Sequence, residues 1–194
     1  TLSGELSREE GENVRADGYA INAGTLTNDN NPNYDITFVP GTFTITRAAI
    51  TPSVSMADWI YGDTASVPVV NGNTGNGEVT YTYAVKSSDV YTEAVPTDVG
   101  EYTIKASIAA NGNCDAGVAT ADFEIIKKRV EVAAENKEKE YGSEDPALTY
   151  TVTSKNGLDV NEVLSNHVLS DIRIERTEGE NVNESGYAIT VSQS

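Results

Sequence analysis

The strongest constraint on this chain is a segment that occurs twice. Residues 8–21 and 176–189 share ten identical residues in fourteen positions, without a gap, at an offset of 168 residues. A match of this extent is not expected by chance, and it predicts an array of repeats. The identical residues are Arg8, Glu10–Val14 and Gly18–Ile21, which recur as Arg176, Glu178–Val182 and Gly186–Ile189.

A second periodicity gives the length of one repeat. The segment Phe43–Arg47 resembles Phe123–Lys127, and Tyr61–Asp63 resembles Tyr141–Ser143, both at an offset of 80 residues. A unit of this size is typical of a small all-β domain. We therefore predict the C-terminal half of one repeat in residues 1–48, a complete repeat in 49–128, and the N-terminal part of a further repeat in 129–194.

Alternation of polar and apolar residues predicts strands throughout these units. The predicted strands are Tyr34–Phe38, Thr42–Thr46, Ile50–Val54, Glu78–Lys86, Glu101–Ile108, Thr120–Ile126 and Val130–Val132. A sheet with one apolar face must bury that face, and a second sheet is the simplest cover. The joints after Thr46 and Ile126 contain no Gly/Ser-rich spacer, which favours a semi-rigid line of units. The fold class expected is all-β, with tandem immunoglobulin-like β-sandwich repeats arranged as an elongated rod.

One segment departs from the strand pattern. Leu158–Leu169 has apolar residues at near-helical spacing, and Asp159 stands where a helix cap would stand. A short helical turn is therefore considered for this segment.

The charge argues against two classes of partner. The formal net charge is −17, and the three predicted units are each acidic, so none presents a basic face to phosphates. Nucleic-acid binding and binding to anionic membranes are therefore disfavoured. No run of 18 apolar residues is present, so we expect no membrane insertion. The single Cys cannot form an internal disulfide, and the lack of an initiator Met fits a piece of a longer protein.

Two regions carry a resemblance to a known family. Residues 141–152 contain Tyr-Gly-x followed by Asp145-Pro146-Ala147-Leu148-Thr149-Tyr150, and residues 4–46 match the tail of the same family. These segments resemble the MBG domain, a mostly-β, glycine-containing domain of Tyr-Gly-x type. The resemblance is weaker in the central unit, where Thr64–Pro68 follows Tyr61-Gly62-Asp63. That unit resembles either a divergent relative of the family or a bacterial immunoglobulin-like variant of the same plan. The resemblance implies tandem β-domains in large bacterial cell-surface or secreted proteins, often adhesins, and no catalytic residues.

The sequence offers few residues for catalysis. His167 is the only histidine and has no neighbouring Ser, Cys or acid arranged as a relay. Cys114 lies in an Asn-Gly-Asn-Cys-Asp turn, where we expect an exposed and incidental thiol. Lys105 could join a spontaneous Lys–Asn isopeptide cross-link only if it were buried, and alternation puts it on the polar face. We expect no catalytic residue and no enzyme.

Two clusters of residues could offer oxygen ligands to Ca²⁺, which needs 6–8 of them. Asn28–Asn33 with Asp35 matches no calcium-loop spacing and is better interpreted as an Asn-rich turn. Glu138, Glu140, Glu144 and Asp145 form an acidic group at the entrance of a unit. The prediction is no metal site and no cofactor.

The Tyr-Gly motif and the repeated acidic segment are given structural roles. We expect the motif's tyrosine to pack at a sandwich end while its glycine permits a tight turn. We interpret Glu10–Val14 and Glu178–Val182 as turns that the fold requires.

The function expected is a non-catalytic stalk segment of an extracellular bacterial surface protein. The alternative is a module that binds a glycan or a host protein through loops or exposed aromatics of the central unit. The candidate aromatics are Trp59, Tyr61, Tyr81, Tyr83, Tyr91 and Tyr102. The expected partners are neighbouring repeats of the same chain. Residues 129–194 lack counterparts of Tyr34–Phe38 and Thr42–Thr46, so we also expect intermolecular pairing of the incomplete end repeats.

Overall fold

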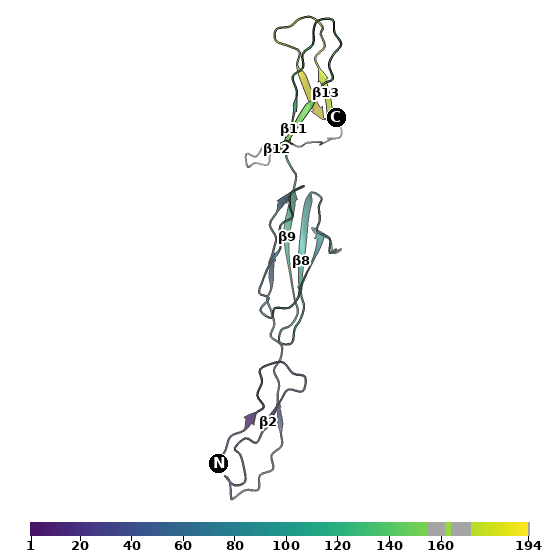
Figure 1. Cartoon of the computed structure of the whole chain (residues 1–194). Coiled ribbons are helices and arrows are strands. Elements are labelled where there is room, and N and C mark those ends of the chain that lie inside the picture. The colour runs from purple at the N-terminus through teal and green to yellow at the C-terminus, as the bar shows by residue number, and fades with distance from the viewer. Residues whose placement is uncertain (155–161, 164–171, 194) are drawn as a thin grey trace. The chain divides into compact units, whose positions relative to one another are not determined.

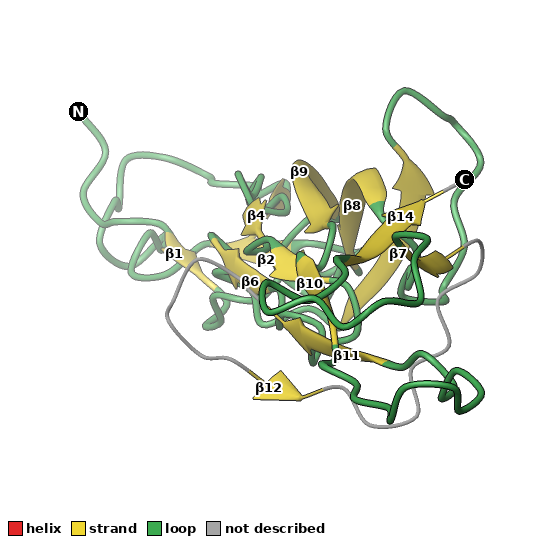
Figure 2. Cartoon of the chain, turned by 90° about the horizontal axis from the view of Figure 1, so that it is seen from above, coloured by secondary structure: helices red, strands yellow, loops and turns green. Residues whose placement is uncertain are grey.

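The computed structural model describes residues 1–154, 162–163 and 172–193. Over these residues the chain is all-β, with fourteen strands and no helix (Figures 1 and 2). The residues separate into two compact units, one made of residues 1–59 and 63–125 and the other of residues 60–62 and 126–194. The division into repeats at 1–48, 49–128 and 129–194 stays a prediction.

A four-stranded sheet forms the centre of the first unit, in the order β5-β9-β8-β7. Its strands are β5 (Trp59–Ile60), β9 (Gly117–Ile126), β8 (Gly100–Ile108) and β7 (Val79–Val85). The pairs β7–β8 and β8–β9 are antiparallel. The three longest strands coincide with three that alternation predicts, so these predictions are confirmed.

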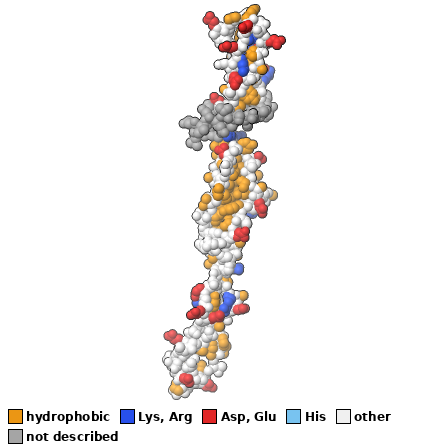
Figure 3. All heavy atoms as spheres, in the orientation of Figure 1, with side chains coloured by type: hydrophobic (Ala, Val, Ile, Leu, Met, Phe, Trp, Pro, Cys, Tyr) orange, Lys and Arg blue, Asp and Glu red, His pale blue; other side chains and the backbone are white. Residues whose placement is uncertain are grey.

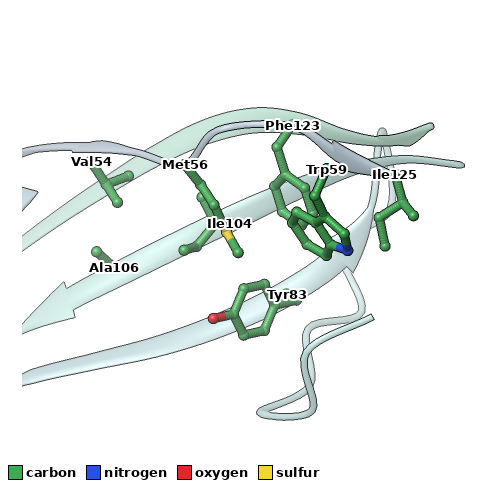
Figure 4. Packing of buried hydrophobic residues seen from close by; sticks show 8 residues of the cluster. All are labelled: Val54, Met56, Trp59, Tyr83, Ile104, Ala106, Phe123 and Ile125. Carbon is green, nitrogen blue, oxygen red and sulfur yellow. The ribbon is translucent and has the colours of Figure 1, made fainter. Parts of the chain in front are cut away.

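A smaller sheet covers the apolar face of the four-stranded one. It pairs β4 (Ser53–Ser55) with β6 (Val69–Asn71) in antiparallel register. Val54 of β4 joins the same buried cluster as Ile104 of β8 and Phe123 of β9, and Val70 of β6 packs against it. The other members of the cluster are Met56, Trp59, Tyr83, Ala106 and Ile125 (Figure 4).

Aromatic contacts organise this core. The ring of Phe123 stacks on Trp59 at 5.1 Å between centroids and on Tyr102 at 5.7 Å. Tyr83 meets Phe123 edge-on at 6.2 Å. Figure 4 shows the rings of Trp59, Tyr83 and Phe123 close together. Period-2 alternation correctly predicts this face of β8 and β9, because Ile104 and Ile125 are fully buried.

The N-terminal residues of the first unit form a three-stranded sheet in the order β1-β2-β3. Its strands are β1 (Ser7–Arg8), β2 (Tyr19–Asn22) and β3 (Gly41–Phe43). The register pairs Arg8 with Ile21 and Tyr19 with Phe43. All three residues of β3 are exposed, so this strand is held mainly by its backbone.

The second unit contains two small antiparallel sheets. One joins β10 (Val130–Ala134), β11 (Tyr150–Ser154) and β12 (Glu162–Val163). The other pairs β13 (Ile172–Arg176) with β14 (Ile189–Gln193). Arg176 lies opposite Ile189, which is the same pairing as Arg8 with Ile21 at the 168-residue offset.

The structure corrects one predicted strand. Tyr34–Phe38 forms no strand, because the amide of Ile36 donates to the side chain of Asn28 at 2.8 Å instead of to a neighbouring strand. The predicted strand Thr42–Thr46 is shortened to Gly41–Phe43.

The helical turn considered for Leu158–Leu169 falls almost wholly outside the described residues, and the two described ones, Glu162 and Val163, belong to a strand. Over the part of the chain that the structure describes, no helix is long and apolar enough to cross a bilayer.

Candidate functional site

The repeated segment builds the same local structure in each of its two copies. In the first copy the guanidinium of Arg8 donates to the carbonyl oxygen of Gly11 at 2.6 Å and pairs with the Glu12 carboxylate. It also lies 5.4 Å from the centre of the Tyr19 ring. The Tyr19 hydroxyl donates to the carbonyl oxygen of Asn13 at 2.7 Å. One arginine and one tyrosine therefore clamp the loop between them.

The second copy repeats these contacts atom for atom. Arg176 donates to the carbonyl oxygen of Gly179 at 2.8 Å and to the Glu180 carboxylate at 2.6 Å. Its guanidinium lies 5.5 Å from the ring centre of Tyr187, whose hydroxyl donates to Asn181 O at 2.8 Å. We call the arginine and tyrosine of each copy a clamp; the first clamp is the pair Arg8 and Tyr19, and the second is the pair Arg176 and Tyr187. The shared clamp accounts for the recurrence of these residues in the two segments.

Glycine is required inside each clamp. Gly11 has φ +142° and Gly179 has φ +147°, a region that side chains disfavour. A Cβ at either position would overlap the tyrosine ring of the same clamp. The glycine of each Glu-Gly-Glu-Asn-Val segment is therefore required by the local fold.

The second unit adds a network of four charged side chains to its clamp. Arg176 and Lys139 each contact the Asp145 carboxylate at 2.6 Å. Both also contact the Glu180 carboxylate at 2.6 Å. Two cations therefore alternate with two anions, and Figure 3 shows acidic and basic side chains side by side in this part of the chain.

These contacts shift the titration of all four groups. Hydrogen bonds from Arg176 and then Lys139 lower the pKa of Asp145 to about 2. Hydrogen bonds from Lys139 and then Arg176 lower the pKa of Glu180. Hydrogen bonds to Asp145 and Glu180 raise the pKa of Lys139 and of Arg176. The network is therefore fully charged at neutral pH.

A cavity of about 380 Å³ lies beside this network. One wall is formed by residues 137–148, and the other by the clamp residues and by Ile189 of β14. The four charged residues of the network line the cavity, together with apolar side chains such as Pro146, Leu148 and Ile189.

A third site lies within the first unit, where the turn of residues 111–115 meets the N-terminal residues. The Asn113 side chain accepts from the amide of Val14 at 2.8 Å and donates to Asn13 Oδ1 at 2.8 Å. The amide of Ala48 donates to Asn113 O at 2.9 Å, and the amide of Asp115 donates to Ala48 O at 3.0 Å. The segment predicted as a simple turn thus also holds neighbouring residues in place.

The aromatic residues considered as a binding platform do not form one. Trp59 is 8% exposed and Tyr83 is 6% exposed, because both belong to the hydrophobic core. Tyr81 and Tyr102 pack against the same core. Tyr61 is exposed, at 49%, and Tyr91 is half-buried.

The structure confirms the role predicted for the glycine of the Tyr-Gly motif and corrects the role predicted for its tyrosine. Gly62 has φ +86° and Gly142 has φ +85°, so both glycines make the tight turns that the sequence predicts. Their tyrosines do not pack as expected: Tyr61 is 49% exposed and Tyr141 is 73% exposed. In the clamps, by contrast, the hydroxyls of Tyr19 and Tyr187 donate to main-chain oxygens of their own loops.

Residues of the two clusters considered as Ca²⁺ sites form hydrogen bonds and ion pairs within the protein. Asn31 is buried, and its side chain bonds to the main chain of Ser3 and Thr27. Asp145 belongs to the four-charge network. Among the described residues, no group of three or more His, Cys, Asp or Glu side chains is arranged to hold a metal ion.

Three further candidate residues were named from the sequence: Cys114, Lys105 and His167. Cys114 is half-buried rather than exposed, because it packs closely against Gly75. The Lys105 ammonium lies over the Tyr91 ring at 3.7 Å from its centre. His167 lies outside the described residues.

The fold and the clamps define an all-β repeat protein, and comparison with known families agrees. The family model of the MBG domain (YGX type) matches residues 1–44 and 130–194, which is more than half of the chain. The chain therefore belongs to the MBG domain family of YGX type. This family is a repeat domain typical of bacterial surface proteins and is not a known family of enzymes. No curated protein and no solved structure matches the chain.

Sequence reasoning missed the four-charge network and the clamps. The sequence does contain a signal for the ion pair of each clamp, because Arg8 and Glu12 recur as Arg176 and Glu180 at i,i+4 spacing. The contribution of Asp145, 31 residues before Arg176, could not be inferred from spacing.

Proposed function

We propose that the chain is a non-catalytic stalk segment of an extracellular, adhesin-like bacterial surface protein. Its repeats, at residues 1–48, 49–128 and 129–194, would be immunoglobulin-like sandwiches arranged as an elongated rod. Such a segment would hold a distal region of its parent protein away from the cell envelope.

The observation that carries this proposal is the use of the repeated residues. Arg8, Tyr19 and their counterparts Arg176 and Tyr187 are engaged in contacts within their own loops. A repeated ligand site would instead leave polar groups free to meet a ligand. Repetition of a purely structural device is typical of arrays whose function is length and spacing.

Hydrogen bonds at the first predicted joint also support the proposal. The contacts of Asn113 with Asn13, Val14 and Ala48 restrain the residues on either side of the first predicted boundary. A flexible linker would lack such contacts.

Small-angle X-ray scattering of the chain tests the rod. A globular protein of this length would have a radius of gyration of about 16 Å. Three repeats in line, each about as long as the ten-residue strand β9, would give roughly 30 Å. A value near the globular one would contradict the rod, and circular dichroism on the same sample would exclude an unfolded chain as the cause of a large value.

The alternative, a module that binds a glycan or a host protein, now depends on Tyr61 and the loops. Trp59→Ala would be a poor test of it, because Trp59 is a core residue. A sugar bound on a glycan array and lost on Tyr61→Ala would favour the module, whereas no binding across the array would favour the stalk.

A further inference from the structure

The strand β7 forms one edge of the central sheet. It stands at the end of the order β5-β9-β8-β7, inside the first compact unit. Its residues, Val79–Val85, include no charged residue, no Pro and no Gly, and all but Ala84 are Val, Thr or Tyr. Val, Thr and Tyr are strongly preferred in strands. Edge strands are usually protected from other strands by charged residues or by Pro, so an edge of this composition is ready to pair.

The main-chain groups that face away from β8 belong to the odd-numbered residues of β7. The amide of Lys86 donates to the main-chain oxygen of Glu101 on β8 at 3.0 Å, so the even-numbered residues face β8. Tyr83 confirms this alternation, because it exchanges two hydrogen bonds with Thr92 on the other side, at 2.7 and 2.8 Å. The other outward-facing residues of the strand are Val79, Tyr81 and Val85.

A short segment after β7, residues 87–92, covers part of this edge, and we call it the strap. Main-chain hydrogen bonds join it to β7 at two points, between Thr92 and Tyr83 and from the amide of Ser88 to the oxygen of Val85. The first residue of the strap has φ +67°, which is unfavourable for a residue other than glycine. A segment held by so few main-chain bonds belongs to the parts of a fold that open most readily.

The centre of β7 carries a hydroxyl group without a hydrogen-bond partner. The Thr82 Oγ1 atom is buried, and no group among the described residues bonds to it. Thr82 lies opposite Lys105 of β8, whose ammonium is covered by the Tyr91 ring of the strap. Burying a hydroxyl without a hydrogen bond is unfavourable, so the closed strap leaves Thr82 in a poor environment.

The charges that flank β7 are complementary when two copies of the strand run antiparallel. Glu78 precedes the strand and Lys86 follows it. A two-fold axis at Thr82 places Glu78 of each copy opposite Lys86 of the other, because both residues lie four positions from Thr82. Opposite charges at facing positions stabilise a sheet, and like charges destabilise it. The net charge of −17 disfavours most contacts between two copies, so this complementarity favours one particular register.

We propose that β7 pairs with β7 of a second copy of the chain, after the strap has moved away from both strands. In this register Thr82 faces Thr82, Tyr81 faces Tyr83 and Val79 faces Val85. The facing pairs that exchange hydrogen bonds are all odd-numbered, so the outward main-chain groups of the two copies meet. The contact uses the same residues on both sides and is complete with two chains.

The pairing replaces the bonds that the strap gives up. Each copy loses the two hydrogen bonds between Thr92 and Tyr83. The new ladder supplies two bonds at each outward-facing pair, and it covers Val85, which is 62% exposed. The two Thr82 hydroxyls face each other at the axis, where a cross-strand Thr–Thr hydrogen bond gives them the partner that they lack within one chain.

A cysteine at the two-fold axis tests the register. The two copies of Thr82 form a non-hydrogen-bonded pair, which is the closest kind of cross-strand pair and is compatible with a disulfide. We expect Thr82→Cys, with Cys114→Ser to remove the native thiol, to yield a disulfide-linked dimer under mild oxidation.

The matched control is Thr80→Cys in the same Cys114→Ser background. Thr80 lies on the same face of β7 and is more exposed than Thr82. In the proposed register it faces Ala84 of the second copy, and the two copies of Thr80 lie about 13 Å apart along the strands, too far for a disulfide. A dimer of Thr80→Cys as abundant as that of Thr82→Cys would overturn the proposal. Free thiols in both variants, with a native Trp59 fluorescence spectrum, would also overturn it.

Hydrogen exchange of the unsubstituted chain tests the movement of the strap. As the concentration rises, the amide of Tyr81 should become protected, because a strand of the second copy accepts its hydrogen bond. The amide of Thr92 should exchange faster, because it loses the oxygen of Tyr83. Association that leaves both amides unchanged, or that protects both, would show that the chains meet elsewhere and would overturn the proposal.

Charge reversal tests the ends of the ladder. Glu78→Lys places like charges opposite each other at both ends, so it should weaken self-association in sedimentation experiments roughly tenfold. Glu78→Lys/Lys86→Glu restores opposite charges and should recover the association. The double variant is compared with both single variants, because Lys86 also pairs with Glu101 and Asp122 of its own sheet. No recovery would overturn the register. A chain that stays monomeric at every attainable concentration would refute the pairing and would leave the stalk proposal untouched.

Discussion

The hydroxyl of Tyr187 donates a hydrogen bond of 2.8 Å to the main-chain oxygen of Asn181. The bond closes the loop of residues 181–187, and Tyr19 closes the equivalent loop on Asn13 at 2.7 Å. In the first copy the amide of Asn13 also returns a bond to the Tyr19 hydroxyl at 3.1 Å. A single phenol group therefore holds a loop that would otherwise have no regular structure.

Removing this phenol oxygen should loosen the loop without unfolding the unit. Tyr19→Phe and Tyr187→Phe should each destabilise their loop by about 1 kcal/mol, the usual net value of one hydrogen bond. Hydrogen exchange of the Asn13 amide should accelerate by about fivefold in Tyr19→Phe. Tyr34→Phe, at an exposed tyrosine of the same unit, should leave that exchange unchanged; an equal effect there would contradict the role of the clamp.

The clamp glycines should tolerate substitution less well than the glycines of the Tyr-Gly turns. Gly62→Ala should cost about 1 kcal/mol, from its positive φ alone, because a Cβ there meets no described atom within 4 Å. Gly11→Ala adds an overlap with the Tyr19 ring, so its cost should be roughly 3 kcal/mol. Urea titrations followed by hydrogen exchange would compare the two, and equal costs would contradict the close approach at Gly11.

Phe123 should be the most sensitive side chain of the central sheet. Phe123→Ala removes contacts with Trp59, Tyr83 and Tyr102, and it should destabilise this core by roughly 3–5 kcal/mol. Trp59 is the only tryptophan, so its fluorescence during urea unfolding reports this core alone. Val118→Ala, on the same strand but 60% exposed, should change the free energy of unfolding by no more than about 0.5 kcal/mol.

The four-charge network should weaken only in strong acid. The folded-state pKa of Asp145 is about 2, below its ordinary value of 3.8. Its stabilising contribution is therefore complete above pH 3.8 and is lost as the pH falls towards 2. NMR titration of the Asp145 carboxyl carbon would measure this value.

Arg176→Gln should raise the pKa of Asp145 towards its ordinary value, because it removes the principal hydrogen-bond donor. Glu9 is the internal control: Arg15 lowers its pKa to about 2, and Arg176→Gln should leave that value unchanged. A shift of both carboxyl groups would indicate a global change instead of a local one.

The Asn113 turn should respond to loss of its acceptor. Asn113→Ala removes the bond from the Val14 amide, so that amide should exchange faster with solvent. Asn113→Asp keeps the acceptor and loses the donor to Asn13, so it should preserve protection of Val14. Identical exchange in the two variants would show that the side chain does not hold the N-terminal residues.

The sequence predicted the central strands well, because their pattern and their packing agree. In β8 and β9 apolar residues alternate along one face, and the residues of this face are buried or half-buried. Where the chain has an Asn-rich turn, pattern and structure diverge. Tyr34–Phe38 alternates like a strand, yet the Asn28 side chain takes the amide of Ile36 and no neighbouring strand pairs with it among the described residues.

The site was predictable only in part. The repeated segment draws attention to Arg8 and Tyr19, but their contact could not be predicted from the sequence. The two side chains lie together only because the loop between them folds back. The same limit applies to Tyr141: the glycine of a Tyr-Gly dipeptide predicts the turn, but the dipeptide does not indicate whether the tyrosine ring is buried or exposed. Aromatic residues in strands could be assigned to the core or to the surface only once their neighbours were known.

The ladder of β9 has a mechanical consequence. Ile50 packs against Gly117, the first residue of β9, whereas the chain leaves β9 at its other end. Tension transmitted through the backbone from Ile50 to Ile125 would therefore act along β9 and shear its nine cross-strand pairs with β8 at once. Bonds that must rupture together resist stretching far better than bonds that open one by one, so this sheet would yield abruptly under pulling.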